Sequence, residues 1–249
     1  MRKKLLAGLA TGFWVLGMAG VASATLTTIG TATYNGSDYN LIWDDDNNGN
    51  SVVWLDYTNA AADWSTQKSW AAGLNDDLNI HLMEGYYVNW NDAEWRLPNT
   101  VDGIGVRGYE GDPDGDGIYS YTYGFNLANA ELGHLFYEEL GNQGYLNTTG
   151  VVQASYGLLN TGDFDNLINS YTYYWSGTEY TNKSDAAWLF GTYYGAQSFT
   201  GIDSYLYGLA LTNAQVSDTA PVPEPVTILL FGTGLAGLAG SRIRRKKKA

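Results

Sequence analysis

The stretch Ile29–Trp43, with the sequence IGTATYNGSDYNLIW, predicts two short strands joined by a turn. Ile29–Tyr34 and Tyr39–Trp43 are rich in apolar and aromatic residues, and the Asn-Gly-Ser-Asp between them is typical of a hairpin turn. Ser51–Tyr57 follows after an acidic turn and continues the same pattern. A sheet is therefore expected near the beginning of the folded body.

Two segments change to helical spacing. Ala60–Leu74 predicts a first helix, with Trp64 and Lys68 one turn apart, and Ala128–Leu140 predicts a second helix that ends before Gly141. Beyond the second helix the pattern returns to strands. An antiparallel meander is expected there, with strands at Tyr173–Ser176, Ala187–Phe190, Ala196–Phe199 and Tyr205–Leu211.

The two ends of the chain predict targeting. Residues 1–24 combine a basic start, an apolar core and the small residues Ala22-Ser23-Ala24, which is typical of a secretory signal peptide; a retained N-terminal anchor is the alternative. Residues 216–225 are expected to be a linker containing Pro223, Glu224 and Pro225. A membrane helix is expected at 226–241 and a basic cytoplasmic tail at 242–249. The apolar run is shorter than the ~20 residues that span a bilayer comfortably, which favours a thin or processed anchor.

The order of Pro-Glu-Pro, apolar run and basic tail resembles the PEP-CTERM sorting signal of bacteria. The resemblance implies that a membrane enzyme, exosortase, recognises the tail as its processing partner. It also implies display at the cell surface or release into an extracellular matrix. The alternative is an ordinary C-terminal membrane anchor that contains Pro-Glu-Pro by chance.

Composition limits what the body can do. Between Thr25 and Val222 there are 4 basic and 25 acidic residues, a net charge of −21, so nucleic acid is not an expected partner. The chain contains 20 Tyr, 9 Trp and 31 Gly but no Cys, which favours a β-rich body with long turns and without disulfides. The length of this segment fits one domain, expected at 25–215.

Several blocks of the body together resemble the Lcl C-terminal domain family of bacterial surface proteins. The most specific of these blocks are Trp95-Arg96-Leu97-Pro98 and Trp175-Ser176-Gly177-Thr178-Glu179. The resemblance implies an α+β, C-type-lectin-like fold, with two helices packed on short, twisted antiparallel sheets. Within the blocks, the tryptophans are expected in the core. Arg96 is expected to be a structural hub rather than a ligand-binding residue.

Two acidic turns match the first half of a calcium-binding loop. The first contains Asp112, Asp114 and Asp116, and the second contains Asp44, Asp46 and Asn48. Neither turn has a Glu at the twelfth position, so a further carboxylate would have to complete either site. The alternative is a solvated turn, which the sequence favours for the second loop. Calcium is the one cofactor predicted.

Catalysis has little support in the sequence, because the chain has no Cys and only two histidines, His81 and His134. The leading hypothesis is a non-enzymatic exported protein whose lectin-like domain binds a glycan or another surface component. The first alternative is a purely structural or adhesive protein of an exopolysaccharide matrix or biofilm. The second, less favoured, is an enzyme that acts on polysaccharide.

Overall fold

The first three strands form the expected hairpin and its continuation. The computed structural model describes residues 26–103, 107–109 and 123–218. Within them, β1 (Leu26–Tyr34), β2 (Ser37–Asn47) and β3 (Asn50–Ala62) pair antiparallel in sequence order. Asn35 and Gly36 join β1 to β2 with positive φ angles of 50° and 78°, the geometry for which Asn-Gly is favoured in two-residue hairpin loops. The predicted hairpin is confirmed.

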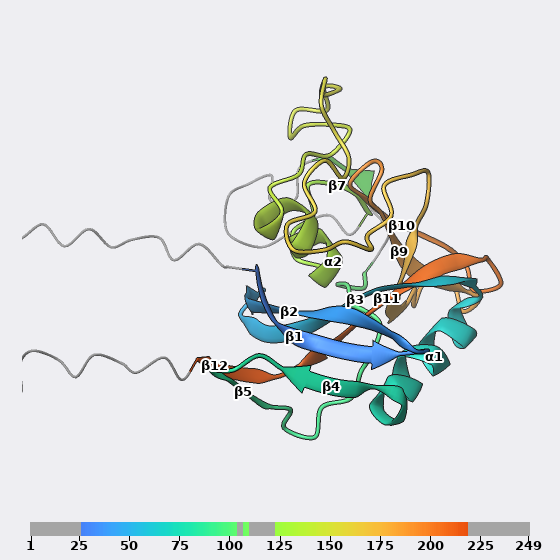
Figure 1. The fold of residues 1–249 in the computed structure, drawn as a ribbon. Coiled ribbons are helices and arrows are strands. Elements are labelled where there is room, and N and C mark those ends of the chain that lie inside the picture. Colours follow the sequence, from blue (N-terminus) through green and yellow to red (C-terminus); the bar gives the residue numbers. More distant parts are fainter. Residues whose placement is uncertain (1–25, 104–106, 110–122, 219–249) are drawn as a thin grey trace, which may run out of the picture.

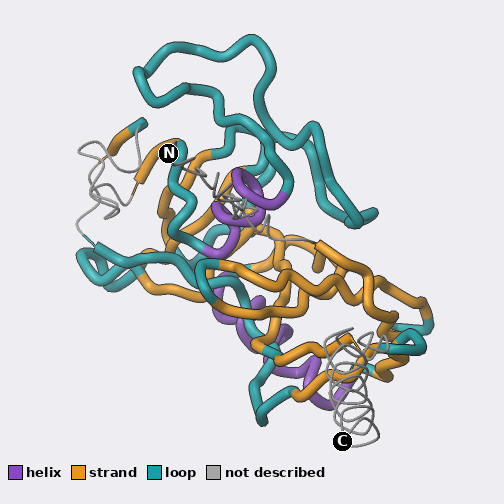
Figure 2. Tube along the Cα trace, turned by 90° about the vertical axis from the view of Figure 1, so that its left-hand side faces the viewer, coloured by secondary structure: helices purple, strands orange, loops and turns teal. Residues whose placement is uncertain are grey.

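The described residues contain nine further strands. Those before residue 130 are short: β4 (Asn79–Leu82), β5 (Tyr86–Asn89), β6 (Arg107–Gly108) and β7 (Tyr123–Phe125). The others are β8 (Tyr174–Glu179), β9 (Ala186–Gly191), β10 (Ala196–Gly201), β11 (Leu206–Asn213) and β12 (Gln215–Asp218). The longest described stretch without a helix or a named strand is 140–173. Figure 2 shows long loops extending beyond one end of the strands.

Ten of the twelve described strands belong to one mixed sheet, in the order β4-β1-β2-β3-β11-β8-β9-β10-β7-β6. β12 pairs separately with β5 (Figure 1). β8, β9 and β10 form an antiparallel meander. β11 leaves the meander, because it pairs parallel with β8 and antiparallel with β3. This strand joins the early and late strands into one large sheet. The predicted α+β, C-type-lectin-like fold, with two helices on short antiparallel sheets, is therefore wrong.

The first helix starts later than predicted. α1 spans Trp64–Asp77, whereas the predicted start, Ala60, lies in β3. Asp63 caps the helix, and its Oδ1 accepts a hydrogen bond from the backbone N–H of Thr66 at 2.8 Å. This is the usual N-cap contact, and it fixes the start of the helix one residue later.

The second helix is much shorter and changes type. α2 covers only Glu131–His134 and continues as a π-helical turn, η1, at Leu135–Glu139. The backbone N–H of Leu140 donates to the carbonyl of Leu135 at 3.0 Å, a spacing of five residues. The predicted regular helix over Ala128–Leu140 is therefore wrong, because apolar spacing alone does not distinguish α from π geometry.

The core lies on both faces of the central strands. Along β3, Val53 and Leu55 belong to one cluster of buried residues, while Val52 and Trp54 belong to another, and all four side chains are fully buried. This alternation follows from the two-residue period of a strand. α1 contributes Ala71 and Leu74 to the first cluster, and α2 with η1 contributes Leu132, Leu135, Phe136 and Leu140 to the second, η1 ending one residue before Leu140. Each helical segment thus covers one face of the same sheet.

Several predicted segments lie outside the described residues: the signal peptide at 1–24, the sorting helix at 226–241 and the basic tail at 242–249. β12 continues the folded body to Asp218, inside the segment expected to be linker. No helix among the described residues has the length and apolar character required to cross a membrane.

Candidate functional site

An open cleft of about 680 Å³ lies between β6, β7, β10 and the loops of 140–173. Aromatic side chains dominate its lining. These are the five tyrosines Tyr123, Tyr145, Tyr156, Tyr173 and Tyr194 and the two phenylalanines Phe125 and Phe199. The cleft therefore offers several flat apolar surfaces whose phenol groups can also form hydrogen bonds.

The aromatic rings of the cleft pack against one another in two separate groups. Tyr123 lies 5.8 Å from Phe199, and Phe125 lies 6.2 Å from Tyr145, measured between ring centroids. Tyr145 meets Tyr156 edge to face at 5.0 Å. These contacts restrict the rotamers of the rings, so the lining is largely organised before any ligand binds.

Backbone geometry sets the β6–β7 wall of the cleft. β7 pairs with β10 through Phe125 and Ala196, and with β6 through Gly124 and Gly108. Gly124 has a φ of 126°, and a Cβ at this position would collide with the carbonyl oxygen of Gly108. Glycine is therefore required for the two strands to approach so closely.

The polar groups of the cleft are mainly hydroxyls. Ser198, Thr200 and Ser204 line it, and the hydroxyls of Thr200 and Ser204 lie 3.2 Å apart. Arg107 is the only cationic residue among the described lining residues, and its Cζ lies 5.8 Å from the ring centroid of Tyr123. The described lining includes no Asp, Glu or His. This part of the cleft thus suits recognition of a neutral, hydroxyl-rich ligand.

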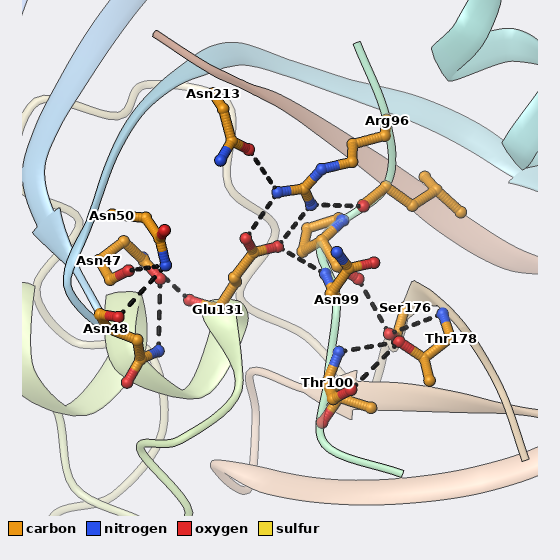
Figure 3. Close-up of polar contacts among 12 residues, drawn as sticks. Asn47, Asn48, Asn50, Arg96, Asn99, Thr100, Glu131, Ser176, Thr178 and Asn213 are labelled. Atoms are coloured by element: carbon orange, nitrogen blue, oxygen red, sulfur yellow. Dashed lines mark hydrogen bonds and ion pairs between the residues drawn. The ribbon is translucent and has the colours of Figure 1, made fainter. Parts of the chain in front are cut away.

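The two sequence blocks that carry the Lcl resemblance lie side by side in the structure. The hydroxyl of Ser176 and the backbone N–H of Gly177 both donate to the carbonyl of Pro98, at 2.9 and 2.8 Å. The backbone N–H of Thr100 donates to Oγ1 of Thr178 at 3.0 Å (Figure 3). Trp95, Leu97 and Trp175 are buried, whereas Glu179 is exposed at the end of β8. These blocks form a structural joint away from the cleft lining.

Arg96 is the most heavily bonded residue of this joint. Its Nη2 donates to Oε1 of Glu131 and to Oδ1 of Asn213, both at 2.7 Å, and its Nη1 donates to Oε2 of Glu131 at 2.6 Å. Glu131 also accepts from the backbone N–H of Asn99 at 2.6 Å (Figure 3). The backbone of Arg96 bonds to Leu211 in β11. Arg96 thus ties its own segment to α2 and to the sheet.

Residues 44–49, predicted as an acidic turn, form the end of β2 and its two-residue connection, Asn48-Gly49, to β3. Asp46 accepts from the backbone N–H of Gly49 at 2.9 Å, and Asn48 has a positive φ of 52°. Asp44 is fully buried and accepts from the indole N–H of Trp54 at 3.1 Å. Across the described residues, no group of three or more His, Asp or Glu is arranged to hold a metal ion. Asp112, Asp114 and Asp116, the other predicted calcium ligands, lie outside the described residues.

The buried carboxyl of Asp44 interacts electrostatically with His134 in α2 and Glu139 in η1. Burial raises the pKa of Asp44 to about 6, although hydrogen bonds from Asn47 and Trp54 oppose the shift. His134 lies 3.2 Å from Glu139, measured from Nε2 to Oε1. Burial lowers the pKa of His134, but Glu139 and the charge of Asp44 outweigh burial, so the pKa is raised. Among the residues that the structure describes, Oδ1 of Asp44 and Oε2 of Glu139 have no hydrogen-bond partner.

The strongest functional information comes from the C-terminal end. The family model described as the PEP-CTERM protein-sorting motif matches residues 221–245. The chain carries a PEP-CTERM sorting motif. The match includes Pro223, Glu224 and Pro225, which confirms the predicted motif, and the PEP-CTERM motif supports an exported protein that exosortase sorts to the cell surface or the extracellular space. No curated protein and no solved structure matches the chain. The resemblance of the body to the Lcl C-terminal domain family stays a prediction.

Sequence reasoning did not identify the residues of the cleft. The signal was present in the density of tyrosines: 171–194 contains Tyr171, Tyr173, Tyr174, Tyr180, Tyr193 and Tyr194. Tyr174 and Tyr180 are buried, whereas Tyr173 and Tyr194 line the cleft. Composition alone therefore could not separate core tyrosines from those of the site.

Proposed function

We propose that the aromatic cleft binds a neutral glycan and that the protein acts, without catalysis, as a glycan-binding component of the cell surface or extracellular matrix. The observation that carries the proposal is the combination of seven aromatic rings with several hydroxyl side chains in one open cleft. Until exosortase removes it, the segment following the Pro-Glu-Pro triplet would hold this cleft at the membrane.

The aromatic lining supports a sugar ligand. A pyranose ring presents C–H groups on its faces and hydroxyls around its edge. Tyrosine offers a matching apolar ring face and a hydrogen-bonding hydroxyl on a side chain with little conformational entropy to lose. Tyr123, Tyr145 and Phe199 supply such faces, and Ser198 and Thr200 supply further hydroxyls.

Charge supports a neutral rather than a polyanionic glycan. The segment from Thr25 to Val222 has 4 basic and 25 acidic residues, a net charge of −21, which repels a long polyanion. Arg107 alone among the described lining residues is positively charged. A chain of neutral hexoses avoids this repulsion, and it can still use Arg107 as a hydrogen-bond donor.

Calorimetric titration with neutral hexose oligosaccharides of different linkage tests the proposal. The exported protein is expected to bind at least one of them, and Tyr145→Ala is expected to weaken binding at least roughly tenfold, which corresponds to about 1.4 kcal/mol. Tyr145 is suited to this test because it contacts Phe125, Tyr156 and Tyr194. Binding by the parent but not by the variant, with both proteins folded, would support the cleft as the site.

Tyr87→Ala is the matched control. Tyr87 lies in β5, is 65% exposed and does not line the cleft, so its removal should leave affinity unchanged. Equal affinity of the Tyr145→Ala variant and the parent would place any binding elsewhere. Flat titrations with every oligosaccharide would favour the purely structural matrix protein. Repeating the titration with a calcium chelator tests whether the predicted Asp112, Asp114 and Asp116 loop contributes.

A further inference from the structure

Tyr171 and Tyr193 form the closest aromatic pair among the described residues. Their ring centroids lie 4.0 Å apart and their planes differ by 29°, so the two rings are stacked. Interaction with the side chain of Tyr193 raises the pKa of the Tyr171 phenol. Two phenol rings thus lie face to face.

The pair is accessible to solvent, and neither ring lines the aromatic cleft. Tyr171 is 69% exposed, and Tyr193 is partly exposed in the turn between β9 and β10. Neither residue lines the cleft, although the neighbouring Tyr194 does. Reagents in solution can therefore reach the pair without entering the cleft.

Because of where the two residues lie, a covalent bond between Tyr171 and Tyr193 would restrain a long loop region. Tyr171 lies near the end of 140–173, the longest described stretch without a helix or a named strand. Tyr193 lies in the turn that connects two strands of the main sheet. Exported proteins commonly fix such loops with disulfides, but this chain has no Cys. A covalent bond here would attach the loop region to the sheet.

We propose that Tyr171 and Tyr193 are a modification site at which an oxidant of the peroxidase–peroxide class forms an intramolecular dityrosine bond. Each phenol loses one hydrogen atom, that is, one electron and one proton, to give a tyrosyl radical. The radicals join through a carbon–carbon bond between ring positions ortho to the oxygens. The two ring hydrogens then move to the oxygens and restore both phenols. One hydrogen peroxide accepts the two hydrogen atoms and becomes two waters, so the step balances.

Stacking selects Tyr193 over Tyr194 as the partner. Ortho carbons bond most readily when two rings face each other, and Tyr171 faces Tyr193 in this way. Tyr194 instead meets Tyr171 edge to face, with centroids 5.8 Å apart and planes at 69°. The adjacent tyrosines of one turn therefore differ in the geometry that coupling requires.

The experiment treats dilute exported protein with a peroxidase and hydrogen peroxide. The expected product is a monomer that has lost two hydrogen atoms, shows dityrosine fluorescence and yields one cross-linked peptide joining Tyr171 to Tyr193. Tyr171→Phe and Tyr193→Phe are each expected to lose most of this product. Either variant keeps the ring and removes only one hydroxyl, so folding should persist, and circular dichroism checks it.

Two control variants complete the design. Tyr87→Phe removes a tyrosine of similar exposure, 65%, from a distant strand, and Tyr194→Phe removes the neighbour in the same turn. Both are expected to keep the Tyr171–Tyr193 product. The proposal would be overturned if the yield were unchanged in Tyr193→Phe but lost in Tyr194→Phe, or if the cross-links mapped to other tyrosines. Covalent dimers alone, or no dityrosine at all, would overturn it as well. Glycan titration reads out a different set of side chains, so failure of one proposal is distinguishable from failure of the other.

Discussion

Arg96 and Glu131 form a two-point ion pair, with Nη1–Oε2 and Nη2–Oε1 distances of 2.6 and 2.7 Å. The side chain of Glu131 is only 12% exposed. Glu131→Gln leaves the guanidinium without its carboxylate and is expected to lower the free energy of unfolding by about 2 kcal/mol, as measured by urea denaturation. Lys183→Ala breaks an exposed 3.4 Å pair with Asp185 and should change stability by less than about 0.5 kcal/mol. Equal effects of the two substitutions would contradict the structural role of the partly buried Arg96–Glu131 pair.

Asp44 predicts a pH-dependent stability. Burial raises its pKa from 3.8 to about 6, so the protonated acid is favoured in the folded state. The stabilising contribution is complete below pH 3.8 and is lost as the pH rises through about 6, a change of about 3 kcal/mol. Asp44→Asn should therefore gain stability relative to the parent between about pH 4 and about pH 7. Denaturation across that range measures the gain, and parallel pH profiles of the two proteins would refute it.

Two helical glycines are expected to respond in opposite directions to alanine. At Gly133 a Cβ would collide with the backbone carbonyl of Leu127, so Gly133→Ala should destabilise by more than about 2 kcal/mol. At Gly73 in α1 the nearest atom to a new Cβ is Oδ2 of Asp77 at 3.7 Å. Gly73→Ala should therefore stabilise by up to about 1 kcal/mol, because alanine is the better helix former. Thermal unfolding of both variants checks the signs, and a neutral Gly133→Ala would contradict the close approach.

Asp56 is expected to hold the loop at Asp165 and Asn166 against the sheet. Its carboxylate accepts from the backbone N–H groups of Asp165 and Asn166, at 2.9 and 3.0 Å. Asp56→Ala leaves both donors without this acceptor, so hydrogen exchange at these two amides should accelerate at least roughly tenfold. Asp203→Ala, at an exposed turn, is the control and should leave their exchange unchanged. Unaltered exchange in Asp56→Ala would show that other contacts hold the loop.

Local patterns predicted the elements better than their assembly. The alternation and Asn-Gly turn at Ile29–Trp43 predicted β1 and β2. Helical spacing predicted α1, whose N-cap is Asp63. The pairing of β3 with β11 was not predictable in the same way, because these strands are far apart in sequence. A strand pattern indicates which residues are buried but does not identify the neighbouring strand. The wrong fold class came from the resemblance to the Lcl C-terminal domain family, because the strand pattern could not show that β11 joins the early and late strands into one sheet.

The candidate sites show the same limit. Pro223, Glu224 and Pro225 were predictable because a sorting motif is contiguous. The cleft instead draws Tyr123 and Tyr194 from distant segments that only the folded sheet brings together. At the 44–49 turn, alternating acids suggested convergence on a cation. In the structure Asp44 lies in β2, paired with Val52, and its side chain is fully buried.

The pairing of β3 with β11 also has a consequence for secretion. A polypeptide that crosses a membrane from its N-terminus exposes Val52, Val53, Trp54 and Leu55 well before the β11 residues that later cover one edge of their strand. An unpaired apolar strand of this kind is prone to aggregate while it waits. Rapid translocation of the whole body, or shielding of this strand until the C-terminal third arrives, would therefore favour productive folding.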